Sequence, residues 1–180
     1  AAGADAPSVA SALRREKLAL AVTLAVGDLA GEFTLLKVTH ELSSFADRAL
    51  DAAIADAIRQ RVPEAQPAGF IALALGKHGA GELNFSSDID PILLYDPAIL
   101  PRRERDEPGE AAQRVARTLM QTMSHVDAEG YVFRVDLRLR PASEVSPLAI
   151  PIEAALTHYE SSALAWERAA FIRARACAGT

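Results

Sequence analysis

Residues Gly76–Asp96 read GKHGAGELNFSSDIDPILLYD. A loop with three glycines leads to an acidic pair, Asp88 and Asp90, which opens an apolar run. In a strand, side chains two residues apart share a face, so a strand over residues 88–95 would project both carboxylates together. Two carboxylates that close repel each other, and a divalent cation such as Mg²⁺ relieves this repulsion by accepting hard oxygen ligands. The stretch therefore predicts a metal-dependent phosphoryl or nucleotidyl transfer site.

The spacing of apolar residues predicts the elements around this stretch. A period near 3.6 indicates helices, and short apolar or alternating runs indicate strands. We therefore expect an α+β fold in three parts: a helical N-terminal segment (1–66), a core with a small mixed sheet (67–150) and a helical C-terminal segment (151–180). The expected helices cover residues 8–29, 32–61 (as one helix or two), 110–126, 152–159 and 163–178, and the expected strands cover 70–75, 89–95 and 131–140.

Composition narrows the class of protein. Half of the 180 residues are hydrophobic and 24% are charged, which is typical of a globular protein. The net charge of −5 argues against a general nucleic-acid binder. The single cysteine, Cys177, rules out an internal disulfide and fits a reducing compartment, and the longest apolar run, Leu18–Val26, is too short to span a bilayer. We expect a cytoplasmic protein without a membrane segment. Because the chain does not start with methionine, we also expect it to be a piece of a longer protein.

A third carboxylate occurs in the alternating stretch 131–140. Apolar residues occupy one set of positions there, and Asp136, Arg138 and Arg140 belong to the other set. Three carboxylates on two strands can hold two cations, which clamp the attacking and leaving oxygens of an in-line displacement. Arg138 and Arg140 would then meet the phosphates of the substrate. The alternative is a set of structural salt bridges between Asp136 and its arginine neighbours.

The glycine loop is the candidate phosphate cradle. Backbone N–H groups around Gly76 and Gly79 can approach a phosphate closely, as in anion-binding nests. Lys77 could add a positive charge and Ser87 a hydroxyl, although a surface lysine and a serine that caps the turn are the alternatives. The spacing fits neither a Walker loop nor a dinucleotide fingerprint. His78 is expected at the surface, and the charges of the second helix, Asp47 among them, on a solvated face.

Three motifs, in this order, resemble the glutamine synthetase adenylyltransferase family. These bifunctional enzymes attach AMP to a tyrosine of glutamine synthetase in one half and remove it in the other. The wording ELNFSSDID, together with WER at residues 166–168, is similar to the N-terminal, deadenylylating half. The motifs are GKHGAGELNFSSDID (76–90), FRVDLRLRP (133–141) and WERAAFIRAR (166–175).

The resemblance implies a polymerase-β-like nucleotidyltransferase fold and a reaction. Inorganic phosphate would attack the tyrosyl-AMP link of glutamine synthetase and release ADP, in the control of nitrogen assimilation. Asp88, Asp90 and Asp136 would hold two Mg²⁺ or Mn²⁺ ions. The implied partners are glutamine synthetase, phosphate, ADP or ATP, and a PII-type signalling protein. Three alternatives stay open: adenylylation from ATP by the same fold, a catalytically silent docking domain, and a nucleotidyltransferase that acts on small molecules or RNA.

Overall fold

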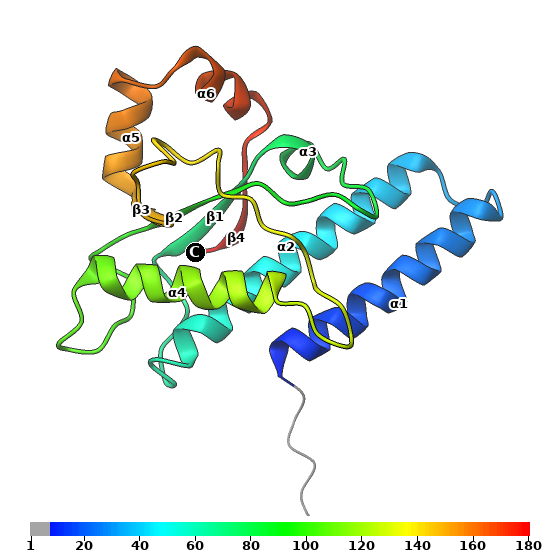
Figure 1. The fold of residues 1–180 in the computed structure, drawn as a ribbon, viewed down its shortest axis with the longest axis horizontal. Coiled ribbons are helices and arrows are strands. Elements are labelled where there is room, and N and C mark those ends of the chain that lie inside the picture. The colour runs from blue at the N-terminus through cyan, green and yellow to red at the C-terminus, as the bar shows by residue number, and fades with distance from the viewer. Residues whose placement is uncertain (1–7) are drawn as a thin grey trace, which may run out of the picture.

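The computed structural model describes residues 8–180, so the first seven residues of the expected N-terminal segment lie outside the described residues. Among residues 8–180, no helix combines the length and the apolar composition that crossing a bilayer requires. Figure 1 shows the arrangement of the elements. In chain order they are α1 (Val9–Leu29), α2 (Leu35–Arg59), β1 (Phe70–Ala74), α3 (Gly76–Gly79), β2 (Pro91–Tyr95), α4 (Pro108–Ser124), β3 (Ala149–Pro151), α5 (Ile152–Ser161), α6 (Ala165–Ala170), the 3₁₀ turn η1 (Phe171–Arg173) and β4 (Arg175–Gly179).

Each of the three long helices begins at a residue that suits a helix N-terminus. The Ser8 hydroxyl accepts a hydrogen bond from the Ser11 backbone N–H at the start of α1, and Thr34 does the same for Lys37 in α2. These side-chain caps satisfy backbone donors that have no partner within the helix. Pro108 is the first residue of α4, where its missing N–H costs nothing. The helices predicted in these regions are confirmed, and residues 35–59 form one helix.

The sheet has four strands in the order β3-β2-β1-β4. Strand β1 pairs antiparallel with both β2 and β4, whereas β2 and β3 are parallel. The expected α+β fold with a small mixed sheet is therefore confirmed. Both predicted strands of the central hairpin are present, and the loop between them, residues 75–90, contains the glycines and the acidic pair. The second strand, expected over residues 89–95, begins only at Pro91, so Asp88 and Asp90 precede it.

Each face of the sheet packs on its own core. Phe70 and Ala72 of β1 lie in the main core with α1, α2 and α4. Ile71 and Leu73, which alternate with them, contact a smaller core formed with α5 and η1. In Figure 1, α5 and α6 accordingly lie at the opposite end of the molecule from α1, which runs beside α2.

Two predicted elements are wrong in part. Residues 131–140 do not form a strand, because only Val135 pairs with a neighbour, in a parallel bridge to Ile89. Burial follows the predicted alternation only in part: Phe133 and Leu137 are buried and Arg134 and Arg138 are exposed, but Val132, on the polar set of positions, is buried too. The helix expected over residues 163–178 ends at Ala170, and residues 175–179 form β4 at the sheet edge beside β1. The C-terminal segment is therefore only partly helical.

Candidate active site

A single parallel bridge between two distant stretches organises the site. The Ile89 N–H donates to the Arg134 carbonyl at 3.0 Å, and the Asp136 N–H donates to the Ile89 carbonyl at 2.9 Å. Ile89 is fully buried, and Val135 packs against the same core. In extended backbone the neighbours of an inward residue point outward. Residues 88, 90, 134 and 136 therefore point to the side of this bridge away from the core.

The bridge brings the three predicted aspartates together. Asp88 and Asp90 flank Ile89, and Asp136 follows the residue paired with it. Asp90 is half-buried, and its side chain forms no ion pair or hydrogen bond with residues 8–180. Burial, with Asp136 and Asp88 as further causes, raises the pKa of the Asp90 carboxyl above its usual range. Burial and its acidic neighbours therefore disfavour the ionised form of Asp90, and no cation among residues 8–180 binds this side chain to offset them.

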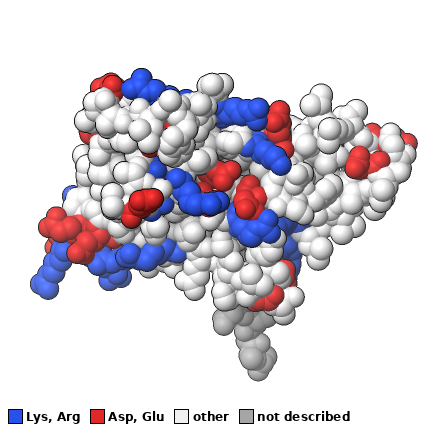
Figure 2. Space-filling model, turned by 45° about the horizontal axis from the view of Figure 1, so that its top comes forward, with Lys and Arg blue, Asp and Glu red and all other residues white. Residues whose placement is uncertain are grey.

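Two arginines bind the other two aspartates. The Arg134 Nε donates to Asp88 Oδ1 at 2.6 Å, and the Arg138 Nε donates to Asp136 Oδ2 at 2.7 Å. The hydrogen bonds from Arg138 lower the pKa of the Asp136 carboxyl. Arg138 has 86% of its side chain exposed and can leave Asp136 at little cost. On the face shown in Figure 2, basic and acidic side chains lie next to each other and do not form areas of one sign.

Arg134 is a site residue that sequence reasoning missed. It also donates to the Ser86 carbonyl at 2.9 Å and to the Tyr131 hydroxyl at 3.0 Å, so it fixes the end of the glycine loop against the segment that carries Asp136. The signal was its place on the same polar positions as Asp136 and Arg138 in the alternating stretch.

The Arg140 side chain binds backbone carbonyls and not an aspartate of the site. Its guanidinium donates to the carbonyls of Leu137 at 2.7 Å and Ser143 at 2.7 Å, and to those of Ser146 and Pro147 at 3.1 Å each. These bonds hold the loop of residues 141–148. The phosphate-binding role expected for Arg140 stays a prediction, and the structure gives this side chain a structural task of its own.

The glycine loop contains one helical turn, α3, which was expected as loop. Gly76 adopts φ +56°, and a Cβ there would lie 3.0 Å from Asp90 Oδ2. Any side chain at Gly76 would therefore crowd the unpaired carboxylate. A Cβ on Gly79 would lie 1.9 Å from the Arg173 carbonyl oxygen, so this glycine lets α3 pack on η1. Gly76 thus adjoins the carboxylates, whereas Gly79 has a packing role.

Lys77 and Ser87 are the other two residues of the predicted phosphate cradle. Lys77 is exposed on α3. The Ser87 hydroxyl donates to Asn84 Oδ1 at 2.9 Å and accepts from the Asn84 N–H at 3.0 Å, so it closes the turn over residues 84–87. Phosphate contacts by Lys77 and Ser87 stay predictions.

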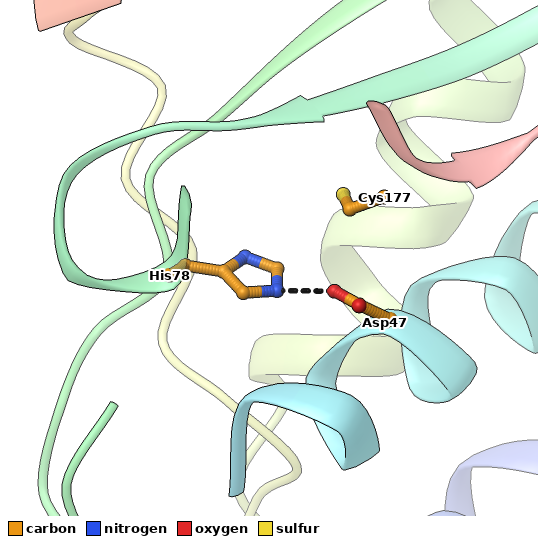
Figure 3. A group of neighbouring side chains, drawn as sticks. All are labelled: Asp47, His78 and Cys177. Atoms are coloured by element: carbon orange, nitrogen blue, oxygen red, sulfur yellow. Dashed lines mark hydrogen bonds and ion pairs between the residues drawn. The ribbon is translucent and has the colours of Figure 1, made fainter. Parts of the chain in front are cut away.

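His78 is buried, so its expected place at the surface is wrong. Its ring is fully inaccessible. Helix α3 packs on β1 and η1, and the His78 Nε2 lies 2.7 Å from Asp47 Oδ1 of α2 (Figure 3). Arg175 of β4 donates to both Asp47 oxygens, at 2.7 and 2.9 Å, and to the His78 carbonyl at 3.3 Å. Asp47 was predicted on a solvated helix face, and that is wrong too. Its partners are 31 and 128 residues away in the sequence, where no local pattern can show them.

The chain matches known proteins over almost its whole length. The family model described as glutamate-ammonia ligase adenylyltransferase matches residues 2–180. The chain belongs to this family. It is 44% identical, over 99% of its length, to the bifunctional glutamine synthetase adenylyltransferase/adenylyl-removing enzyme of Caulobacter vibrioides, and covers 19% of that protein. It is 42% identical, over 99% of its length, to the protein of the same name from Rhizobium meliloti, and covers 20% of it.

The chain therefore spans about a fifth of the length of these curated relatives. Membership confirms the family that the three motifs resemble. The relatives' names give two activities, the addition and the removal of an adenylyl group. Which of them belongs to this stretch is a question for its site.

The three aspartates suit Mg²⁺ or Mn²⁺ by donor type. Carboxylate oxygens are hard ligands of the kind these ions take, and Asp90 offers one that no cation among residues 8–180 binds. The fit requires movement, because Arg134 and Arg138 bind Asp88 and Asp136. A closer trio lies elsewhere: one ligand atom each from Asp47, His78 and Cys177 lie within 4.8 Å of one another (Figure 3).

The trio of Asp47, His78 and Cys177 is nevertheless a poor metal site. Arg175 already neutralises Asp47 through two hydrogen bonds. Metal binding requires the Cys177 thiolate, but burial raises the pKa of the thiol to about 12. The thiol donates to the Ala72 carbonyl at 3.3 Å instead. The Asp47 carboxylate is therefore fully paired and the Cys177 thiol stays protonated, although the buried His78 Nδ1 has no hydrogen-bond partner among residues 8–180.

Proposed function

We propose that this chain carries the adenylyl-removing site of a glutamine synthetase adenylyltransferase. The reaction is the phosphorolysis of an adenylylated tyrosine of glutamine synthetase, which yields ADP and the free hydroxyl. The observation that carries the proposal is the convergence of Asp88, Asp90 and Asp136 around one bridge, with Asp90 unpaired. The names of the relatives include glutamine synthetase and adenylyl removal, which supports adenylylated glutamine synthetase as the proposed substrate.

The chain's own residues have separate tasks in this proposal. Asp88, Asp90 and Asp136 would hold Mg²⁺ or Mn²⁺. When bound, such ions supply charge stabilisation at the phosphoryl oxygens. Arg138, which is exposed and adjoins Asp136, neutralises phosphate charge once it leaves that carboxylate. Gly76 leaves room for the substrate beside Asp90, because no side chain stands there.

Bonds and charges balance without a protein nucleophile. An oxygen of inorganic phosphate forms a bond to the phosphorus of the AMP group, and the bond from that phosphorus to the tyrosyl oxygen breaks. The tyrosyl oxygen leaves as a phenolate and takes up a proton. Because negative charge grows on the leaving oxygen, nearby cations stabilise the transition state more than the ground state.

The reverse activity, transfer of AMP from ATP to glutamine synthetase, is the second candidate because the relatives' names include it. The full-length protein separates the two candidates. It is incubated with adenylylated synthetase and phosphate, and separately with unmodified synthetase and ATP, as wild type and as Asp88→Asn. We expect the variant to lose removal and to retain addition. If Asp88→Asn loses addition and retains removal, the proposed direction is wrong.

A catalytically silent docking domain would behave differently, since Asp88→Asn would then change neither reaction. Asp106→Asn is the matched control, because Asp106 also binds arginines but lies on the loop before α4, among residues that the site does not use. We expect this control to keep both activities. Contact with a PII-type signalling protein and a cytoplasmic location belong to the same proposal.

A further inference from the structure

Four consecutive residues near the start of α1 are charged, and the last of them has unusual partners. The first three each bind a residue of opposite charge. Lys17 binds no carboxylate of residues 8–180, although it is half-buried. The three ion pairs are Arg14 with Asp127 at 2.6 Å, Arg15 with Glu129 at 2.8 Å, and Glu16 with Arg48 at 3.0 Å.

The Lys17 ammonium lies against two aromatic rings instead. Its Nζ is 4.5 Å from the centre of the Tyr131 ring and 4.6 Å from that of Phe133. The Phe133 ring is fixed in the core, 5.8 Å from the ring of Phe45. Cation–π contacts stabilise an ammonium here but do not neutralise it. Burial, and then Arg134, lower the pKa of Lys17, which shows that this ammonium is poorly compensated.

Arg134 shares one of these rings. Its guanidinium carbon lies 5.8 Å from the centre of the Tyr131 ring, and its Nη1 donates to the Tyr131 hydroxyl. Two cations therefore contact the same ring, and the only carboxylate that binds either of them among residues 8–180 is Asp88, on Arg134. A divalent ion bound by Asp88 would draw that carboxylate away from Arg134. The two cations would then lack a counter-charge at the edge of the carboxylate cluster.

We propose that Lys17 and Arg134 form an anion site for inorganic phosphate. The Tyr131 ring contacts both cations, and of the two Arg134 binds Asp88 at the edge of the cluster. The inference rests on the proposed function, in which phosphate is the attacking substrate. It adds the place where phosphate binds and a residue of α1 that contacts it. Residues 8–29, expected as part of a separate helical segment, thus contribute to the site.

The test uses the full-length protein and the phosphate dependence of AMP removal. Lys17→Met keeps the apolar stem between the rings and removes the charge. We expect its KM for phosphate to rise about tenfold or more, from the loss of one charge-assisted contact, with kcat at saturating phosphate nearly unchanged. Lys17→Arg should restore the low KM. An unchanged KM in Lys17→Met would overturn the proposal, and so would a fall in kcat alone.

Lys37→Met is the matched control, because the Lys37 Nζ also lies over a ring, 3.8 Å from the centre of Phe33, at the opposite end of α1. We expect its phosphate dependence to equal that of the wild type. If Lys17→Met does not fold, Lys17→Gln replaces it with the same expectation. An equal rise in KM in Lys37→Met would mean that a general loss of positive charge is responsible, which contradicts the site.

Direct binding separates this inference from the proposed function. Titration of inorganic phosphate into the full-length protein with Mg²⁺, followed by ³¹P NMR, needs no turnover. If phosphate binds in the wild type and weakly in Lys17→Met while AMP removal is absent, the site stands and the proposed reaction fails. If AMP removal proceeds and phosphate binds equally in both, the site fails and the reaction stands.

Discussion

One turn of helix, α3, connects two clusters of charged side chains that differ in how fully their charges are paired. At the start of α3, Gly76 adjoins Asp90, a half-buried carboxylate with no cationic partner among residues 8–180. Near its end, His78 binds Asp47, and both carboxylate oxygens of Asp47 accept hydrogen bonds from Arg175. The paired cluster can stabilise the fold but has little capacity left for a ligand. In the cluster of Asp88, Asp90 and Asp136, exposed arginines bind Asp88 and Asp136 but Asp90 has no cationic partner among residues 8–180, so this cluster is the one suited to bind a metal ion.

The comparison predicts opposite effects for two similar substitutions. Asp90→Asn removes a carboxylate that its acidic neighbours destabilise, so the midpoint of thermal unfolding should stay the same or rise. Loss of metal stabilisation is worth several kcal/mol at the transition state, so AMP removal should slow about a thousandfold. Rates and unfolding curves of the same preparation check both statements. Normal AMP removal by Asp90→Asn would show that Asp90 is not part of the active site.

Asp47→Asn should show the opposite pattern. Breaking this partly exposed ion pair should lower the free energy of unfolding by about 2 kcal/mol at pH 7, less than for a fully buried pair. Although burial raises the pKa of Asp47, the bonds from His78 and Arg175 outweigh it and lower the pKa. A carboxylate with a lowered pKa stabilises the fold above its unfolded pKa of about 3.9 and loses this effect as the pH falls further.

Urea denaturation at pH 7 and pH 3 measures this pH dependence. The difference between wild type and Asp47→Asn should be large at pH 7 and smaller at pH 3. A difference that grows as the pH falls would contradict the paired state of Asp47.

Gly76→Ala tests the connection between the clusters. The left-handed conformation of Gly76 should cost an alanine about 1 kcal/mol of stability. The added Cβ, 3.0 Å from Asp90 Oδ2, should also displace that carboxylate and weaken Mn²⁺ binding. Gly81→Ala is the matched control, because Gly81 also has positive φ but nothing lies within 4 Å of its Cβ position. If both variants lose Mn²⁺ affinity equally, backbone strain is the cause.

Arg138→Gln should have the smallest effect. Its side chain is exposed, so its ion pair with Asp136 should contribute nothing measurable to the unfolding midpoint. AMP removal should slow about tenfold, the effect of one lost charge-assisted hydrogen bond to phosphate. A clear fall in the unfolding midpoint would place Arg138 in a structural salt bridge.

The fold was predictable wherever a period was regular over enough residues. The long helices and the central hairpin follow from apolar spacing and from glycine and proline at their ends. The stretch 131–140 follows the predicted alternation of burial only in part, because Val132 is buried beside Phe133, and only Val135 pairs with another stretch. Strand β4 reads RACAG, without β-branched or aromatic residues, and forms because β1, about 100 residues earlier, offers a free edge.

The site residues also differ in whether the sequence could predict them. Asp88, Asp90 and Asp136 could be found because each lies in a short motif with a chemical reason for its spacing. Arg134 shares the polar positions of Asp136, but its role, like that of Lys17, could not be predicted because it depends on the ring of Tyr131 and on charges from three separate stretches. His78 was misplaced because its two charged partners lie on α2 and β4.

Titration of this chain with Mn²⁺ tests the central claim most directly. Calorimetry is carried out on wild type, Asp90→Asn and the control Asp106→Asn, each shown to be folded. We predict that wild type and Asp106→Asn bind Mn²⁺ with the same affinity and that Asp90→Asn does not bind it. Equal Mn²⁺ binding by Asp90→Asn and the wild type would contradict the assignment of Asp88, Asp90 and Asp136 as the metal site.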